Sequence, residues 1–439
     1  MKKRIIGLWL WLGLMLALLA QPVQAGHRVV LLTVEGAITP STADYIERGL
    51  RRAEEMGAAA LLIRLDTPGG DVGATLEIMQ SFENAAVPVI VYVAPRGAQA
   101  MSAGTYITLA AHAAAMAPHT TIGAAHPVGQ EGEDLPATLD EKLVNALVGR
   151  MNVITRRRGE EAVAWAERAV RESIVATDEE ALEIGLVDVV ADDVDDLLTK
   201  LDGHEVETVN GSIALALRGA EVVEIPPSPL ERLLHFLTDP NVVAILLVVG
   251  VQAILIELSA PGGWVAGFLG TLSLVLAAYG IGILPVNWLG MAFIVIAFVL
   301  FILDIKAPTH GALTLAGTGS LIAGLLVFFN APPGSPYGKV SVPLVIALSS
   351  ISAAIFAFLV VKVVQTYRKP PVTGREGLLH AEGITKTALK PEGIVFVQGE
   401  RWQARSLVGP LPRGTKVRVA GREGFILLVE PVEPVGEVG

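Results

Sequence analysis

The residues best suited to chemistry lie in one stretch, residues 64–128. Gly69 and Gly70 follow an apolar run, and Ser102 precedes a run of small residues that can form a helix. Paired glycines let the backbone approach a ligand and direct N–H groups at it. A serine at the start of a helix lies at the positive end of the helix dipole. A hydroxyl facing fixed N–H donors is what acyl transfer requires.

The predicted oxyanion hole uses the backbone N–H groups of Gly70, Gly69 and Ala103. These donors come from two consecutive β–α units. The alternative is that Ser102 is only a helix cap and the glycine pair only a turn. The occurrence of both features together favours a catalytic site over that alternative.

A serine nucleophile needs a base, and the sequence offers two. His126 follows Ser102 by 24 residues, near the end of a predicted strand. Lys142 follows Ser102 by 40 residues and is the only lysine between Arg4 and Asp196. Arginine does not lose its proton in proteins, whereas lysine can. Lys142 is therefore the one basic side chain of this region, apart from histidines, that can act as a base.

The surroundings of Lys142 predict a helix that extends to about Arg157. Thr138 and Glu141 match a capping box, which would place Lys142 in the first turn, where the helix dipole disfavours a cation. An ordinary surface lysine remains the alternative. The predicted apolar face of this helix contains Leu139, Leu143, Leu147 and Met151.

Alternating strands and helices must position these residues. Apolar runs at 29–34, 59–65 and 89–93 show little alternation, as expected for parallel strands buried on both faces, and helical patterns separate them. A mostly parallel sheet with helical crossovers is predicted. The fold class of residues 26–225 is therefore α/β.

Residues 1–25 have the form of a secretory signal peptide. Basic residues precede an apolar run, and Val23 and Ala25 lie at the −3 and −1 positions of a cleavage site. An uncleaved anchor helix is the alternative. Either interpretation predicts that the α/β domain is exported.

Composition indicates a membrane protein, because 52% of the residues are hydrophobic and the mean hydropathy is +0.55. Residues 230–365 contain about five apolar runs, which we interpret as five transmembrane helices, with four as the alternative. Five spans place the C-terminus in the cytoplasm, and the basic residues after the last run agree.

The remaining composition excludes several classes. The net charge of −11 argues against a nucleic-acid partner. The absence of cysteine excludes a thiol nucleophile and thiolate metal sites, and no H-E-x-x-H motif is present. We therefore expect no metal and no cofactor. Residues 372–437 contain short strand-like runs between glycines, typical of a small OB-like β-barrel that serves in protein interaction or stabilisation.

The motifs DTPGG (66–70), MSAGT (101–105) and IGAAHPV (122–128) resemble the NfeD family of membrane-bound serine proteases. That family belongs to the superfamily of Clp protease, signal peptide peptidase A and crotonase. The resemblance implies a crotonase/Clp-like ββα spiral in the long form with a C-terminal OB-like domain. It also implies an ATP-independent endopeptidase with a Ser102–Lys142 dyad, although His126 resembles the position of the Clp protease histidine.

By the same resemblance, the substrates would be apolar segments of membrane-associated proteins, and a stomatin-like (SPFH) membrane protein would be the partner. We also expect a homo-oligomer of at least two chains. A non-enzymatic scaffold for stomatin-like proteins that retains the protease fold is the competing class. An acyl-CoA enzyme of the crotonase type is disfavoured, because its substrate is cytoplasmic and this domain is predicted to be exported.

Overall fold

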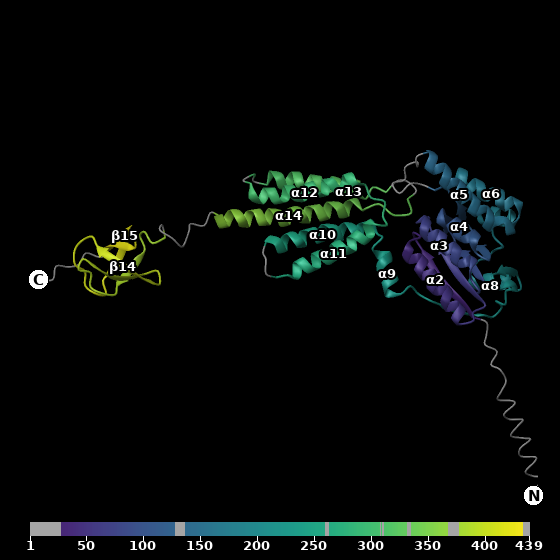
Figure 1. Cartoon of the computed structure of the whole chain (residues 1–439), viewed down its shortest axis with the longest axis horizontal. Coiled ribbons are helices and arrows are strands. Elements are labelled where there is room, and N and C mark those ends of the chain that lie inside the picture. The colour runs from purple at the N-terminus through teal and green to yellow at the C-terminus, as the bar shows by residue number, and fades with distance from the viewer. Residues whose placement is uncertain are drawn as a thin grey trace, which may run out of the picture. The chain divides into compact units, whose positions relative to one another are not determined.

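The computed structural model describes residues 28–127, 137–259, 263–307, 309, 311–331, 335–367 and 377–432. The predicted signal peptide, the segment 128–136 and the basic residues after the last apolar run lie outside these ranges. The chain forms two compact units, residues 1–355 and 356–439, and each is described by itself (Figure 1).

The α/β domain is built on a six-stranded sheet with the order β11-β1-β2-β3-β5-β8, and every neighbouring pair is parallel. Its strands are β1 (Arg28–Glu35), β2 (Ala60–Asp66), β3 (Val89–Val93), β5 (Ala113–Met116), β8 (Val189–Val190) and β11 (Glu221–Glu224). All five residues of β3 are buried, because helices cover both faces of the sheet. The predicted parallel α/β architecture is confirmed.

A second, three-stranded sheet lies beside the first and carries the candidate nucleophile at the end of one strand. It contains β4 (Gln99–Met101), β6 (Thr121–Gly123) and β7 (Val175–Thr177), in the order β4-β6-β7. Strand β4 is parallel to β6, and β7 is antiparallel to it. An antiparallel hairpin is formed by β9 (Glu205–Thr208) and β10 (Gly211–Ala214).

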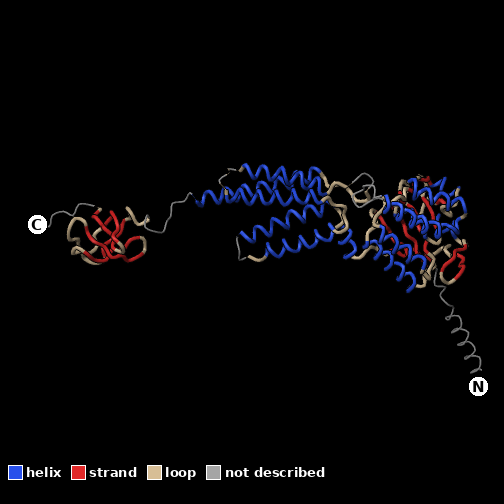
Figure 2. The backbone as a smooth tube through the Cα atoms, turned by 45° about the horizontal axis from the view of Figure 1, so that its top comes forward, coloured by secondary structure: helices blue, strands red, loops and turns tan. Residues whose placement is uncertain are grey.

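Helices connect the strands of the two sheets (Figure 2). They are α2 (Pro40–Glu55), α3 (Val72–Glu83), α4 (Ala103–Ala110), α5 (Ala137–Thr155), α6 (Glu160–Glu172), α7 (Asp178–Glu183) and α8 (Val194–Leu201), with a 3₁₀ turn, η1 (Arg156–Arg158), after α5. Asp71 is the N-cap of α3, and its carboxylate accepts the Ala74 N–H at 2.7 Å.

The helix that carries Lys142 begins earlier than predicted. Because α5 already includes Ala137, Thr138 lies inside the helix, and the predicted capping box at Thr138 and Glu141 is wrong. Lys142 is the sixth residue of the helix and lies in its second turn. The dipole acts mainly within the first turn, so it disfavours a cation less here than we expected.

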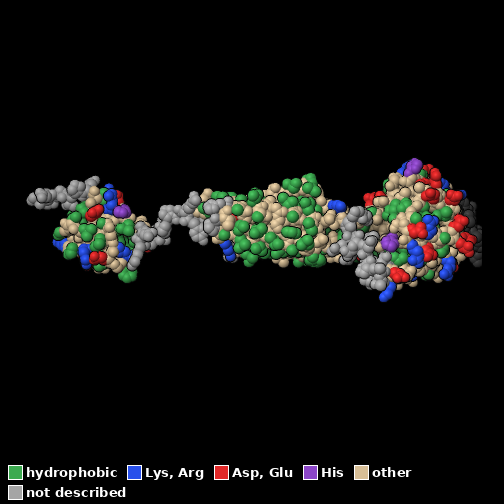
Figure 3. Space-filling view, turned by 90° about the horizontal axis from the view of Figure 1, so that it is seen from above, with side chains coloured by type: hydrophobic (Ala, Val, Ile, Leu, Met, Phe, Trp, Pro, Cys, Tyr) green, Lys and Arg blue, Asp and Glu red, His purple; other side chains and the backbone are tan. Residues whose placement is uncertain are grey.

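Five apolar helices follow among the described residues: α10 (Pro240–Ser259), α11 (Val265–Ile281), α12 (Trp288–Lys306), α13 (Ala312–Phe328) and α14 (Val342–Tyr367). Three of them, α10, α12 and α14, are long and apolar enough to cross a membrane, whereas α11 and α13 have 17 residues each. Their outer surface is mostly hydrophobic (Figure 3). The number of membrane crossings stays a prediction.

The hairpins α10–α11 and α12–α13 repeat one another. Glu257 near the end of α10 accepts the N–H groups of Trp264 and Gly267 at 2.9 and 3.3 Å, and Asp304 of α12 accepts the Thr314 N–H at 3.1 Å. The matched pairs, each 47 positions apart, are Glu257/Asp304, Trp264/Gly311, Gly267/Thr314 and Gly270/Gly317. In each hairpin the acid therefore caps the start of the second helix.

The C-terminal unit contains a closed five-stranded barrel with the order β12-β13-β14-β16-β15. Its strands are β12 (Glu382–Thr385), β13 (Glu392–Val397), β14 (Glu400–Ser406), β15 (Lys416–Glu423) and β16 (Ile426–Pro431). The expected OB-like barrel is confirmed. Strand β12 has only four residues and includes Gly383, whose missing side chain lets it approach Phe396.

Candidate active site at the end of β4

Ser102 is held in a strained conformation between β4 and α4. Its φ of 50° and ψ of −112° lie in a region that costs free energy for any residue except glycine. Two hydrogen bonds hold it there: the Ser102 N–H donates to Gly123 O at 2.9 Å, and the Thr105 N–H donates to Ser102 O at 3.0 Å. Strain that the surroundings fix in this way is concentrated at functional sites.

The Gly69–Gly70 turn faces this serine, as the sequence predicts. A Cβ atom added to Gly69 would lie 2.8 Å from Ser102 Cβ and 3.2 Å from its Oγ. A Cβ atom added to Gly70 would lie 2.1 Å from Ile38 O. Both glycines are needed because the backbone passes too close to its neighbours for any side chain.

Two of the three predicted oxyanion donors have an open N–H. Ile38 bonds to the residues that flank Gly70, so the Gly70 N–H has no hydrogen bond within the described part of the chain. Ala103 is the first residue of α4, and its N–H has no intrahelical acceptor. The Gly69 N–H, in contrast, donates to Thr67 Oγ1 at 3.0 Å and is already used.

Buried threonines that the sequence did not single out hold this arrangement. Thr105 Oγ1 lies 3.0 Å from Ala100 O and 2.8 Å from Gly123 O, which ties the start of α4 to β4 and β6. The Met101 N–H donates to Thr67 O at 3.0 Å. Thr67 and Thr105 lie within the motifs DTPGG and MSAGT, but residue type alone does not show which backbone groups they hold together.

A small apolar pocket opens beside Ser102. Its lining comes from α3, α4, α5 and the segment after β6: Gly70, Val72, Thr75, Leu76, Ser102, Ala103, Tyr106, Ala125, Pro127 and Leu147. The Tyr106 hydroxyl donates to Ala125 O at 3.0 Å, and burial raises its pKa above the usual value. The surface next to the nucleophile is therefore apolar.

Lys142 lies on the helix that contributes Leu147 to this pocket. The predicted apolar face is present, since Leu143 is partly buried and Leu147 and Met151 are buried, whereas the Leu139 side chain lies outside the described part. The Lys142 side chain is exposed and makes no hydrogen bond or ion pair with any described residue. The structure does not bring Lys142 and Ser102 into hydrogen-bond contact.

The other polar residues of the motifs have structural partners. His126 is partly buried, and its Nδ1 donates to Val170 O of α6 at 2.9 Å. Asp66 Oδ1, at the end of β2, accepts the N–H of Gln99 in β4 at 3.0 Å. His112 is buried, its Nδ1 accepts the Val89 N–H at 3.0 Å, and burial lowers its pKa to about 4.

Three family models match the chain in succession. The model for the NfeD1b N-terminal domain matches residues 28–210, and that for the NfeD integral membrane domain matches residues 241–362. The model for the NfeD-like C-terminal, partner-binding domain matches residues 375–431. Together they cover the α/β domain, the apolar helices and the barrel.

Characterised relatives resemble the chain over nearly its whole length. The membrane-bound protease PH1510 of Pyrococcus horikoshii is 36% identical over 95% of this chain and 96% of its own, and the membrane protein NfeD1b of Bacillus subtilis is 26% identical over 92% and 93%. The solved 1510-N membrane protease specific for a stomatin homolog, from P. horikoshii, is 35% identical, with a TM-score of 0.43 over 49% of this chain and 100% of that one. The resemblance in the three sequence motifs is thus confirmed, and the chain belongs to the NfeD family, in its long form with an α/β protease-type domain, a membrane domain and a C-terminal OB-like barrel.

Proposed function

We propose that the chain is a membrane-anchored serine endopeptidase and that Ser102 is its nucleophile. The observation that carries this proposal is the strained Ser102 at the start of α4, beside the open N–H groups of Gly70 and Ala103. A structural serine needs neither the strain nor the adjacent donors. The 36% sequence identity to a membrane-bound protease, over 95% of this chain, supports the same reaction class.

In the proposed mechanism, Ser102 Oγ attacks the carbonyl carbon of the scissile peptide bond. The Gly70 and Ala103 N–H groups bind the oxygen that becomes negatively charged. Neutral Lys142 accepts the serine proton and then gives it to the leaving amine, and water hydrolyses the acyl-enzyme by the same route in reverse. Lys142 is exposed and makes no hydrogen bond to Ser102 here, so in this proposal its side chain approaches Ser102 when the substrate binds. His126 is the alternative base.

The substrate class follows from the pocket. Val72, Leu76 and Leu147 form an apolar wall beside the nucleophile, which fits an apolar side chain of a protein substrate. The family resemblance favours a stomatin-like membrane protein as partner and cleavage without ATP, and the C-terminal barrel matches a partner-binding domain model. An assembly of at least two chains belongs to the same proposal.

The proposed topology places the α/β domain, residues 26–225, outside the cytoplasm after removal of a signal peptide at residues 1–25. Five crossings between residues 230 and 365 would leave the barrel, residues 372–437, in the cytoplasm. The lengths of α10, α12 and α14 support a multi-pass protein. Reporter fusions after Arg28 and after Glu437 should report opposite sides of the membrane, and equal signals would contradict the five-span count.

Fluorophosphonate labelling of the full chain tests the nucleophile. The probe should label the native chain, and Ser102→Ala should abolish the label. Ser81→Ala is the matched control, because Ser81 is an α3 serine whose hydroxyl donates only to Glu77 O and should not affect labelling. If the native chain is folded but takes no label, the serine is not activated, and the non-enzymatic scaffold is the better interpretation.

A further inference from the structure

Helix α9 (Pro229–Phe236) has an apolar face that no described part of the chain covers. Leu230 is 63% exposed, Leu233 45% and Phe236 59%. Their spacing of three places all three on one side of the helix. Exposed Arg232 lies at the border of this face. A cluster of large apolar side chains on a soluble surface marks a binding site rather than ordinary exposure.

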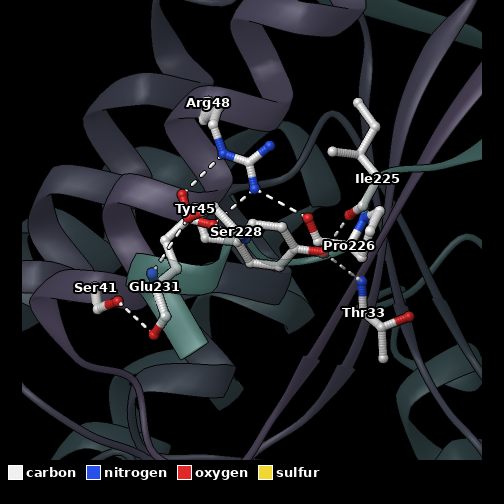
Figure 4. A network of polar contacts seen from close by, with 8 residues as sticks. All are labelled: Thr33, Ser41, Tyr45, Arg48, Ile225, Pro226, Ser228 and Glu231. Carbon is white, nitrogen blue, oxygen red and sulfur yellow. Dashed lines mark hydrogen bonds and ion pairs between the residues drawn. The ribbon is translucent and has the colours of Figure 1, made fainter. Parts of the chain in front are cut away.

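The opposite face of α9 is fixed to α2 (Figure 4). Arg48 of α2 donates from Nε and Nη2 to the two carboxylate oxygens of Glu231, at 2.8 and 2.7 Å. Ser41 Oγ donates to Glu231 O at 3.3 Å, and the Tyr45 hydroxyl donates to Ile225 O at 2.6 Å. A bidentate pair of this kind fixes orientation as well as distance. Helix α9 is thus held to the α/β domain with its apolar face outward.

The local sequence also stabilises α9 as a separate helix. Ser228 and Glu231 form a capping box, so the carboxylate that binds Arg48 also accepts the Ser228 N–H at 2.7 Å. The Arg48 guanidinium holds the pKa of the Glu231 carboxyl below its usual value. The helix ends at Phe236 with Leu237 as its C-cap, and the Thr238 hydroxyl then donates to His235 O at 2.7 Å in a turn.

The position of α9 in the chain identifies what covers its apolar face. The first membrane helix, α10, begins at Pro240, four residues after Phe236. Leu237 packs closely against Gly280 of α11. A Cβ atom at position 280 would lie 2.4 Å from Leu237 O, so only glycine allows this contact. The apolar face is therefore continuous with the membrane segment, where lipid is the adjacent apolar phase.

We propose that α9 is an interfacial membrane helix, with Leu230, Leu233 and Phe236 inserted among the lipids of the leaflet on the side of the α/β domain. Because Glu231 on the opposite side binds α2, one short helix joins the domain to the bilayer surface and sets its orientation there. The occupant of this face is lipid, not a second protein. The inference does not depend on the peptidase activity.

The absence of cysteine makes the test direct. Leu233→Cys and Phe236→Cys, each labelled with an environment-sensitive fluorophore in the full chain, are compared in vesicles with and without lipids brominated near the headgroup. Arg51→Cys on the exposed face of α2 is the control. We expect a blue-shifted emission and at least threefold stronger quenching at positions 233 and 236 than at position 51.

Quenching at 233 and 236 that equals the control would overturn the proposal. So would emission that is blue-shifted but insensitive to bromine and that depends on the protein-to-lipid ratio, since a second copy of the chain would then cover the face. Loss of peptidase activity in a labelled chain would not affect the result, because the readout is lipid contact.

Discussion

The two sides of the candidate active site differ in how firmly the fold holds them. On the serine side, all eight residues of α4 are buried, and hydrogen bonds to β4 and β6 fix the strained Ser102. On the lysine side, α5 exposes Lys142, and the neighbouring Leu143 is only partly buried. The nucleophile and oxyanion donors are thus preorganised, whereas the proposed base is not.

This difference suggests where control of the activity lies. Preorganised donors stabilise a transition state without any reorganisation at the moment of reaction. In the proposed mechanism, the base completes the site only when it approaches Ser102, and a closing step of this kind is a common way for a substrate to switch on its own cleavage. Removing parts of the two sides should therefore give different signatures.

The largest effect is expected for the serine. Ser102→Ala should lower kcat for an apolar peptide by about 10⁴-fold or more, because no other group can form the acyl-enzyme. Single-turnover cleavage by the full chain in detergent measures this, with Ser81→Ala as control. Substantial cleavage by Ser102→Ala would show that Ser102 is not the nucleophile.

Activity should depend on whether the side chain at position 142 can accept a proton, and not on its positive charge. Lys142→Arg should lose about as much activity as Lys142→Ala, on the order of 10³-fold, because a guanidinium cannot accept the proton. Adding Ser102→Ala to either variant should cost little more, since the two residues act as a unit.

His126→Ala provides the contrast for Lys142. It should change activity less, because the His126 imidazole is bonded to Val170 O of α6. If His126→Ala is as severe as Ser102→Ala while Lys142→Ala is nearly harmless, the histidine is the base. The contrast between a preorganised serine side and an exposed lysine side would then not explain the catalysis.

Acid should destabilise the folded protein through the buried His112, which follows α4. His112 has a pKa of about 4 in the folded state and about 6.5 when unfolded, so its neutral form stabilises the fold above pH 6.5. That contribution, about 3 kcal/mol, is lost as the pH falls from 6.5 to 4. Thermal melts across this range should show a smaller pH dependence for His112→Gln than for the native chain. Equal slopes would contradict the assignment.

The smallest effect is expected for Gly149→Ala on the lysine side, which we compare with Gly70→Ala on the serine side. Gly149 of α5 has open space around its Cβ position, so Gly149→Ala should stabilise the helix by about 0.5–1 kcal/mol and leave peptide binding unchanged. Gly70→Ala should instead disrupt the turn, because its Cβ would meet Ile38 O. Melting temperature and kcat together distinguish the two; a harmless Gly70→Ala would remove the argument for a tight oxyanion turn.

The sequence by itself determined much of the fold and the nucleophilic half of the site. Apolar runs without alternation predicted the parallel strands, and the glycine pair and the small residues around Ser102 predicted a turn facing a serine. These features depend on backbone conformations that only a few residue types allow, so the local sequence is enough to predict them. Strand β3 was predicted with the observed bounds for the same reason.

Only the tertiary structure decided which groups are available. The Gly69 N–H is occupied because Thr67 folds back onto it, and the Gly70 N–H is open because Ile38, from a distant loop, bonds on either side of it. The pocket combines α3, α4 and α5, and the outward face of α9 depends on Arg48, 183 residues before Glu231. Hydrogen-bond occupancy and exposure depend on residues brought together from remote parts of the chain, and no local pattern encodes them.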